Sequence, residues 1–201
     1  MHLAPLLKRL AAVAALVAAI PASAGMVDFD GTNAPELFAD SVALSDLYAP
    51  LGLAFSGASA VGGSILNQSA EMGFLARSGT DFLAFNVEAG TGRDERISFA
   101  SPQNTVSIHA AAFESGRFTM TAFDGAGNVL GLTSLDTSRE WQALTFAGAG
   151  IRSVVVASTT GGWALDDLSF AGAVEVPEPG SLALLGAGLL GFAAVRRRRG
   201  K

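Results

Sequence analysis

The sequence predicts an all-β domain, an antiparallel sandwich or barrel, placed between two apolar terminal segments. From residue 81 onward, short β-rich runs recur about every 8 to 12 residues, a spacing typical of sandwiches and barrels. Residues 1–24 and 176–201 contain seven of the 13 basic residues and only one acid. The middle, residues 25–175, has 17 acids against six arginines, so its net charge is 6 − 17 = −11.

Length and composition limit the classes of function. A chain of 201 residues allows one domain with appendages. The strongly acidic middle segment makes binding to nucleic acid phosphates improbable, so we expect no nucleic acid partner. The absence of cysteine excludes disulfide scaffolds, thiolate zinc sites and cysteine nucleophiles.

The N-terminus is predicted to be an export signal. Lys8 and Arg9 precede an apolar run over residues 10–20, and Ala22 and Ala24 form a small-x-small cleavage site. The alternative, a retained transmembrane helix, is disfavoured because eleven residues span only about 16 Å of a roughly 30 Å hydrocarbon core. We therefore expect export by the Sec machinery and removal of the first 24 residues by signal peptidase.

The elements of the middle segment follow from its alternation of apolar and polar residues. Its first third is less regular, with predicted strands over 26–29 and 53–55 and a short helix over 35–48. The glycine-rich residues 124–128 predict a hairpin connection, and residues 160–162 predict a second chain reversal. The other predicted strands cover residues 82–87, 96–99, 105–113, 117–123, 128–134, 141–146, 151–157 and 163–170.

The C-terminus combines an extended linker, an apolar helix and a basic end. Prolines fix φ and lack a backbone donor, so residues 173–181 are predicted to be extended and accessible. Residues 182–195 carry no charge and are predicted to form a hydrophobic membrane helix. The basic tail, residues 196–201, resists translocation and holds this end on the cytoplasmic side. We expect a protein delivered outward and held by its tail in the inner membrane.

These terminal residues resemble a known sorting signal. Pro177, Glu178 and Pro179, followed by a short Leu/Ala/Gly helix and an arginine cluster, look like the PEP-CTERM signal of exported bacterial proteins. The resemblance implies cleavage near this motif by an exosortase, a membrane-embedded cysteine transpeptidase-like enzyme. It also implies a host that makes extracellular polysaccharide, and hence a place at the cell surface or in a biofilm matrix. The arginines of the cluster are Arg196, Arg197, Arg198 and Arg199.

A plain tail anchor that is never processed is the competing interpretation. It uses the same helix and arginines but gives no role to the Pro-Glu-Pro motif.

The middle segment carries a second, looser resemblance. Its motifs are an opening Phe29-Asp30, Tyr-x-x-Leu-Gly-x-x-Phe over 48–55, Ala-Phe-Asp-x-x-Gly-Asn over 122–128 and a closing Trp-Ala-Leu-Asp-Asp-Leu-x-Phe over 163–170. They recur in ectodomains of PEP-CTERM proteins and look similar to galactose-binding-like jelly rolls, the sandwich used by many carbohydrate-binding modules. The resemblance implies a jelly-roll-like sandwich over residues 25–172.

No catalytic constellation emerges from the residues. His109 is the one histidine outside the signal segment, and a lone strand histidine is more often structural than a base. Neither a Gly-x-Ser-x-Gly elbow nor a His-Glu-x-x-His pair accompanies it. Asp94 and Glu95 are paired carboxylates, but Arg93 and Arg96 bracket them, which is typical of a solvated charged turn. We therefore expect no enzymatic activity.

Aspartates near the two ends of the domain form a candidate calcium site. Asp28 and Asp30 offer oxygens at alternate positions, and Asp166 and Asp167 lie near the last strand. The jelly-roll resemblance implies that the first and last strands are neighbours, often with a structural calcium ion between them. The alternative is that these carboxylates cap turns, accept backbone hydrogen bonds or face solvent.

Sugar binding is the other candidate chemistry. Aromatic faces stack on sugars, and Tyr48, Trp141 and Trp163 are the large amphipathic aromatics available, with a core role as the alternative. The predicted function is thus a non-enzymatic structural or adhesive protein linked to exopolysaccharide. The second prediction is a carbohydrate-binding module in the same location.

Overall fold

The computed structural model describes residues 24–31, 44–57, 62–68, 75–84 and 94–172. The signal peptide residues before Ala24, and the linker, apolar helix and basic tail predicted over 173–201, lie outside these ranges. The helical segments in the described ranges lack the length and hydrophobicity of a membrane span.

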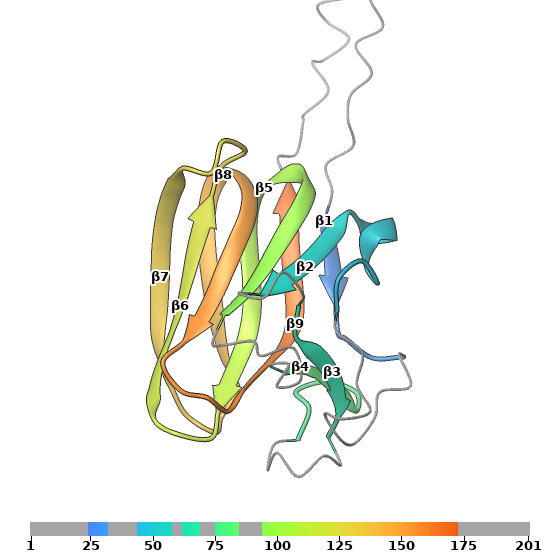
Figure 1. Ribbon diagram of the computed structural model, residues 1–201, viewed down its shortest axis with the longest axis vertical. Coiled ribbons are helices and arrows are strands. Elements are labelled where there is room, and N and C mark those ends of the chain that lie inside the picture. The colour runs from blue at the N-terminus through green and yellow to red at the C-terminus, as the bar shows by residue number, and fades with distance from the viewer. Residues whose placement is uncertain (1–23, 32–43, 58–61, 69–74, 85–93, 173–201) are drawn as a thin grey trace, which may run out of the picture. The chain divides into compact units, whose positions relative to one another are not determined.

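The described residues form nine antiparallel strands and one short 3-10 helix, so the all-β prediction is confirmed (Figure 1). The strands follow the order β3-β4-β9-β5-β8-β6-β7, and β1 pairs with β9 while β2 pairs with β5. The elements are β1 (Ala24–Val27), η2 (Ala49–Leu51), β2 (Leu53–Gly57), β3 (Ser64–Asn67), β4 (Asp81–Ala84), β5 (Asp94–Ala112), β6 (Gly116–Phe123), β7 (Val129–Thr137), β8 (Gln142–Ser158) and β9 (Trp163–Gly172).

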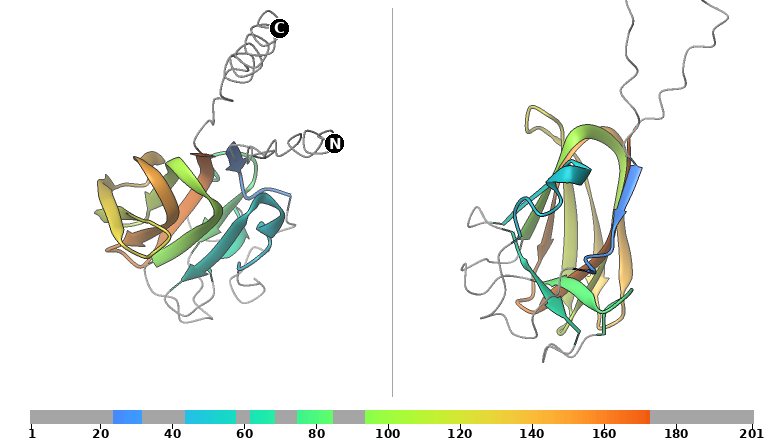
Figure 2. Two further views of the ribbon diagram at one scale, coloured as in Figure 1. Left: turned by 90° about the horizontal axis from the view of Figure 1, so that it is seen from above. Right: turned by 90° about the vertical axis from the view of Figure 1, so that its right-hand side faces the viewer.

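Strands β5 and β8 each contribute to two layers. The register of β5 against β8 shifts between Ser98 and Thr105, where β5 bends over in Figures 1 and 2. Before the bend β5 lies between β2 and the end of β8; after it, β5 lies between β9 and the start of β8. The sequence predicted separate strands here, because the residues of the bend lack alternation. The connected sheet therefore folds over itself into two layers.

The core lies between these layers, where alternate side chains of each strand meet. Ile97, Ile108, Phe118 and Leu144, from β5, β6 and β8, are all essentially buried in one cluster. Each such side chain stabilises the fold by roughly 1.5 to 3 kcal/mol. A second, smaller buried cluster consists of Leu66, Phe82, Ala84, Ala111 and Ala164.

The first third of the domain differs from its prediction. Strand β3 was not predicted, because its sequence shows no alternation against polar residues. The helix predicted over 35–48 is not found in its described part, residues 44–48. Residues 35–43 of that prediction lie outside the described ranges.

The predicted hairpin between β6 and β7 is confirmed. Asp124 Oδ1 accepts hydrogen bonds of 2.8 Å from the backbone N–H groups of Ala126 and Asn128. Gly127 has φ of 84°, in the left-handed region that glycine adopts without a steric cost. The second predicted reversal, residues 160–162, lies as expected between β8 and β9.

Both ends of the described domain lie at one end of the sandwich. Ala24 of β1 is opposite Ala171 of β9, whereas Ala112 and Trp163 are paired at the other end of β9 (Figure 1). At about 3.3 Å per residue, the ten residues of β9 separate the two ends by roughly 30 Å. The turns that join β5 to β6, β7 to β8 and β8 to β9 therefore lie opposite the domain's termini.

Candidate functional site

The first and last strands are neighbours, as the jelly-roll resemblance implied. Met26 of β1 is opposite Ser169 of β9, so the residues that follow β1 lie beside the middle of β9. Asp28, Asp30 and Asp167 consequently line one open hollow of about 430 Å³. Its other lining residues are Met26, Arg77, Ser78, Gly79, His109 and Ser169.

Asp166 lies behind this hollow and is fully buried. Its Oδ2 accepts hydrogen bonds from the backbone N–H groups of Arg77 and Ser78, at 2.8 and 3.3 Å. Its Oδ1 accepts one of 2.7 Å from the N–H of Asp167. Burial raises the pKa of Asp166 to about 6, against the opposing effect of these three donors. Asp166 therefore anchors the 77–78 segment rather than facing solvent.

The aspartates that line the hollow are also bonded within the protein. Asp167 has φ of 46°; its Oδ1 accepts a hydrogen bond of 2.7 Å from Ser78 Oγ, and its other oxygen is ion-paired with the Arg77 guanidinium. Asp30 Oδ1 accepts hydrogen bonds of 2.8 and 3.0 Å from the N–H groups of Thr80 and Asp81. The segment 77–81 thus binds carboxylates from both ends of the domain, Asp30 near its start and Asp167 near its end.

This arrangement does not present a calcium cage. Calcium takes six to eight oxygen ligands, whereas here a guanidinium and several N–H groups already contact the carboxylate oxygens. Within the described ranges, no group of three or more acidic or histidine side chains is placed to hold a metal ion. The geometry favours turn-binding carboxylates, and calcium binding by Asp28, Asp30, Asp166 and Asp167 stays a prediction.

Arg77 and Ser78 were not singled out from the sequence. They lie about 90 residues before Asp167, and neither belongs to a recognisable motif. The tertiary fold places Arg77 and Ser78 beside β9, and no local sequence pattern predicts this contact.

His109 faces the same hollow from β5. Burial lowers the pKa of His109, the Arg77 charge lowers it further, and Asp167 opposes both effects. The Ser78 hydroxyl donates to Asp167 and not to the imidazole, so these side chains do not form a nucleophile–base relay.

The three aromatic candidates for sugar stacking lie in different environments. Trp163 is 1% exposed in the core, so its indole face is not accessible to a sugar, which corrects the prediction for this residue. Tyr48 packs edge-on against Phe29, with ring centroids 5.9 Å apart, and burial raises its pKa to about 12. Trp141 is half-buried, and its Nε1 donates a 2.9 Å hydrogen bond to the carbonyl oxygen of Leu75.

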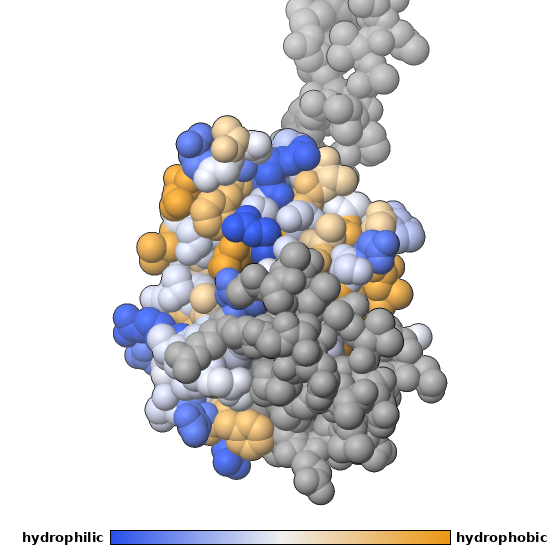
Figure 3. All heavy atoms as spheres, in the orientation of Figure 1, coloured by the Kyte–Doolittle hydropathy of each residue, from blue (hydrophilic) through white to orange (hydrophobic). Residues whose placement is uncertain are grey.

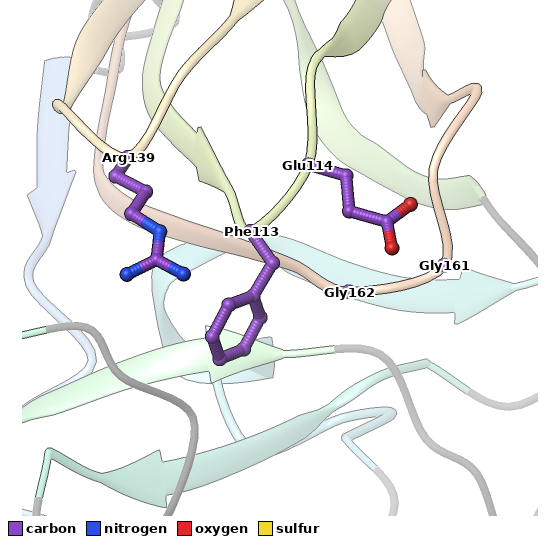
Figure 4. Close-up of a pocket in the computed structure, with 5 residues that line it drawn as sticks. All are labelled: Phe113, Glu114, Arg139, Gly161 and Gly162. Atoms are coloured by element: carbon purple, nitrogen blue, oxygen red, sulfur yellow. The ribbon is translucent and has the colours of Figure 1, made fainter.

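A second open hollow, of about 480 Å³, lies at the end of the sandwich opposite the termini. Phe113, Glu114, Arg139, Gly161 and Gly162 line it, from three different turns. Figure 4 shows Arg139 and Glu114 on either side of Phe113, with the glycine backbone passing beside them. The Arg139 guanidinium carbon lies 5.4 Å from the centroid of the Phe113 ring, a cation–π contact.

Sequence reasoning did not identify these residues as a site. Phe113 ends a predicted strand, and the other lining residues lie in predicted connections, Gly161 and Gly162 in the predicted reversal, without a recognisable motif. The sequence did place these residues in or beside chain reversals, and exposed loops commonly carry functional residues.

The molecular surface also shows apolar side chains along the β7 side (Figure 3). Val129 and Leu132 are more than half exposed, and Leu130 is exposed to a smaller extent. β7 ends the strand order of the sheet, so these side chains belong to an edge strand.

Several solved structures are similar to this chain. A CBM61 domain, TmCBM61, in complex with β-1,4-galactotriose is 11% identical, with a TM-score of 0.37 over 60% of this chain and 83% of that chain. The xylan-binding domain from CBM 22 is 13% identical, with a TM-score of 0.39 over 66% and 94%. The family 32 CBM from C. perfringens NanJ, in complex with galactose, is 9% identical, with a TM-score of 0.36 over 65% and 99%.

No curated protein matches the chain. At its C-terminus, residues 175–199 match the family model described as the PEP-CTERM protein-sorting motif. The chain therefore carries a PEP-CTERM protein-sorting motif, which begins three residues after the last described strand ends at Gly172.

Proposed function

We propose that the protein is an exported surface or extracellular-matrix protein that an exosortase processes through its sorting motif. Export by the Sec machinery and signal peptidase cleavage after Ala24 would deliver the domain outward. The apolar segment 182–195 would then hold it in the inner membrane until processing.

The observation that carries this proposal is the position of the motif relative to the fold. Strand β9 ends at Gly172, and the motif begins at residue 175. Cleavage near the Pro-Glu-Pro residues, 177–179, would leave every described strand intact. The domain would therefore keep its fold through the transfer.

We infer a non-enzymatic structural or adhesive role, linked to exopolysaccharide, for the released domain. The acidic excess of residues 25–175 keeps such a domain soluble outside the cell. In the hollow of the aspartates, Asp167 is bonded to Ser78 and Arg77, and Asp30 accepts from the backbone N–H of Thr80.

The intact mass of the mature protein, recovered from the producing bacterium, tests the processing. We expect a mass that lacks the segment from the motif to Lys201, and a full-length C-terminus when Pro177, Glu178 and Pro179 are all replaced by alanine. Glu140→Ala, at an exposed site in the domain, serves as the control and should be processed normally. A wild-type protein that keeps Arg196–Arg199 would refute exosortase processing.

A carbohydrate-binding module is the second candidate function. The observation that favours it is the open hollow beside Phe113, at the end of the domain opposite Gly172. A domain held through its C-terminus would present this end away from its attachment. Binding of the full chain to immobilised polysaccharides tests the function, and the absence of binding to any of them would favour the structural role alone.

A further inference from the structure

We propose that the hollow formed by Phe113, Glu114 and Arg139 is a binding site for a neutral, hydroxyl-rich glycan. This inference rests on the carbohydrate-binding function proposed above and names the residues and the ligand class of that site.

The hollow is held open by turns that are bonded to one another. The N–H of Ala112 donates to the carbonyl oxygen of Ser138 at 2.9 Å, and the N–H of Phe113 donates to that of Gly162 at 3.0 Å. These two bonds connect the turn after β5 to the turns before and after β8. Because the three turns fix one another, the side chains that they carry need little reordering when a ligand binds.

A third bond fixes the position of Glu114. Its backbone carbonyl oxygen accepts a 3.0 Å hydrogen bond from Thr137 Oγ1, at the end of β7. The side chain of Glu114 points to the hollow from this anchored backbone (Figure 4).

The two charged side chains of the hollow are available to a ligand. Arg139 and Glu114 are both exposed, and neither side chain makes a hydrogen bond or ion pair with another residue in the described part of the chain. The carboxylates of Asp166 and Asp167 differ, because N–H groups, a hydroxyl and a guanidinium occupy their oxygens. The charged groups of Arg139 and Glu114 can therefore form hydrogen bonds with a ligand.

The charges of the hollow select a neutral ligand. An anion attracted by Arg139 would meet Glu114 across the hollow, and a cation attracted by Glu114 would meet Arg139. The net charge of −11 over residues 25–175 adds repulsion toward anionic polymers. A hydroxyl group both donates and accepts hydrogen bonds, so a sugar diol satisfies a guanidinium and a carboxylate at once.

The apolar part of the site and its size fit a sugar ring. Phe113 is half-buried and the Arg139 guanidinium lies over its ring. The part of the side chain that stays exposed offers an apolar contact to the C–H groups of a pyranose. The volume of about 480 Å³ falls within the usual range of small-ligand sites, roughly 300 to 1,000 Å³. A Cβ atom added at Gly161 would meet no atom within 4 Å, so the backbone there borders open space.

Three variants of the full chain, purified in detergent, test the site on immobilised neutral glycans built from galactose, glucose or xylose. Polygalacturonate serves as the anionic contrast. Arg139→Gln and Glu114→Gln remove one charged partner each, and Gly161→Gln fills the hollow. Gly125→Gln is the matched control, because a Cβ there makes only an ordinary contact of 3.5 Å with Arg152, at the opposite end of the domain.

We expect a neutral glycan to bind wild type and the Gly125 control alike, and to bind each of the three variants at least about tenfold more weakly. Circular dichroism and the melting temperature establish that each variant is folded. Neutral-glycan binding that is within twofold of wild type in all three folded variants would place the sugar elsewhere and overturn this site. A preference for polygalacturonate would overturn the ligand class, and no binding to any glycan would overturn the carbohydrate-binding function itself.

Discussion

Glu95 Oε2 accepts a 2.8 Å hydrogen bond from the backbone N–H of Gly63, inside the core of the sandwich. The Glu95 side chain is fully buried, and its Oε1 has no hydrogen-bond partner among the residues that the structure describes. Burial raises the pKa of Glu95 to about 8, with the hydrogen bond from Gly63 opposing it and the charge of Asp94 adding to it. The residue predicted to lie in a solvated charged turn is therefore a buried acid on β5.

The first prediction concerns the pH dependence of stability. Since the folded pKa of Glu95 lies above its ordinary value of 4.5, its contribution to stability is full below pH 4.5 and is lost as the pH rises to about 8. Over this range one proton changes the free energy of unfolding by about 1.4 kcal/mol per pH unit. We expect wild type to lose stability between pH 7 and 8 and Glu95→Gln to keep it, as measured by urea denaturation.

Two other groups with shifted pKa values titrate below this pH window. The pKa of Asp166 is raised to about 6, and that of His109 is lowered, so both have largely titrated below pH 7. Glu114→Gln, at an exposed glutamate, is the control and should show the wild-type slope. Equal slopes in wild type and Glu95→Gln would show that Glu95 is ionised in the folded protein at neutral pH.

The second prediction concerns calcium. Because N–H groups and the Arg77 guanidinium already contact the oxygens of Asp30, Asp166 and Asp167, we expect the melting temperature to be unchanged in excess EDTA. Differential scanning calorimetry with and without added calcium measures this. A melting temperature that EDTA lowers and calcium restores would show that a bound calcium ion stabilises the fold and would contradict this prediction.

The third prediction separates the two tryptophans. Trp163→Ala removes a fully buried indole and is expected to lower the free energy of unfolding by roughly 3 to 5 kcal/mol. Trp141→Ala removes a half-buried side chain and one hydrogen bond to Leu75, and is expected to cost about 1 kcal/mol. Urea denaturation monitored by circular dichroism compares them, and equal losses would contradict their different burial.

The fourth prediction uses two glycines. A Cβ atom on Gly63 would collide with the carbonyl oxygen of Ala84, which is backbone and cannot swing away. Gly63→Ala is therefore expected to destabilise the fold by roughly 1 to 3 kcal/mol. Gly161→Ala, where the added methyl group meets open space, should stay within about 0.5 kcal/mol of wild type. The thermal unfolding of both variants tests this, and a Gly63 variant as stable as wild type would contradict the close approach.

Prediction from sequence succeeded where local pattern controls structure. Alternation identified most strands from residue 94 onward, and the Asp124–Asn128 turn follows from residues that bond to their own backbone. Prediction from sequence failed where the environment of a side chain depends on residues far away in the chain. Glu95 lies between two arginines in the sequence, yet its side chain points inward because alternate residues of β5 face the core.

The sequence by itself determined the all-β class of the domain and the sorting motif at residues 175–199, because strand periodicity and a short linear motif are both local properties. Only the tertiary structure decided which polar side chains are used within the protein and which face outward. Arg77 satisfies Asp167 across 90 residues of chain, whereas Arg139 lies beside Phe113 at the far end of the sandwich without an acidic partner among the described residues. The physical reason is that antiparallel pairing brings together residues that are far apart in the chain, and a side chain's partners depend on that pairing.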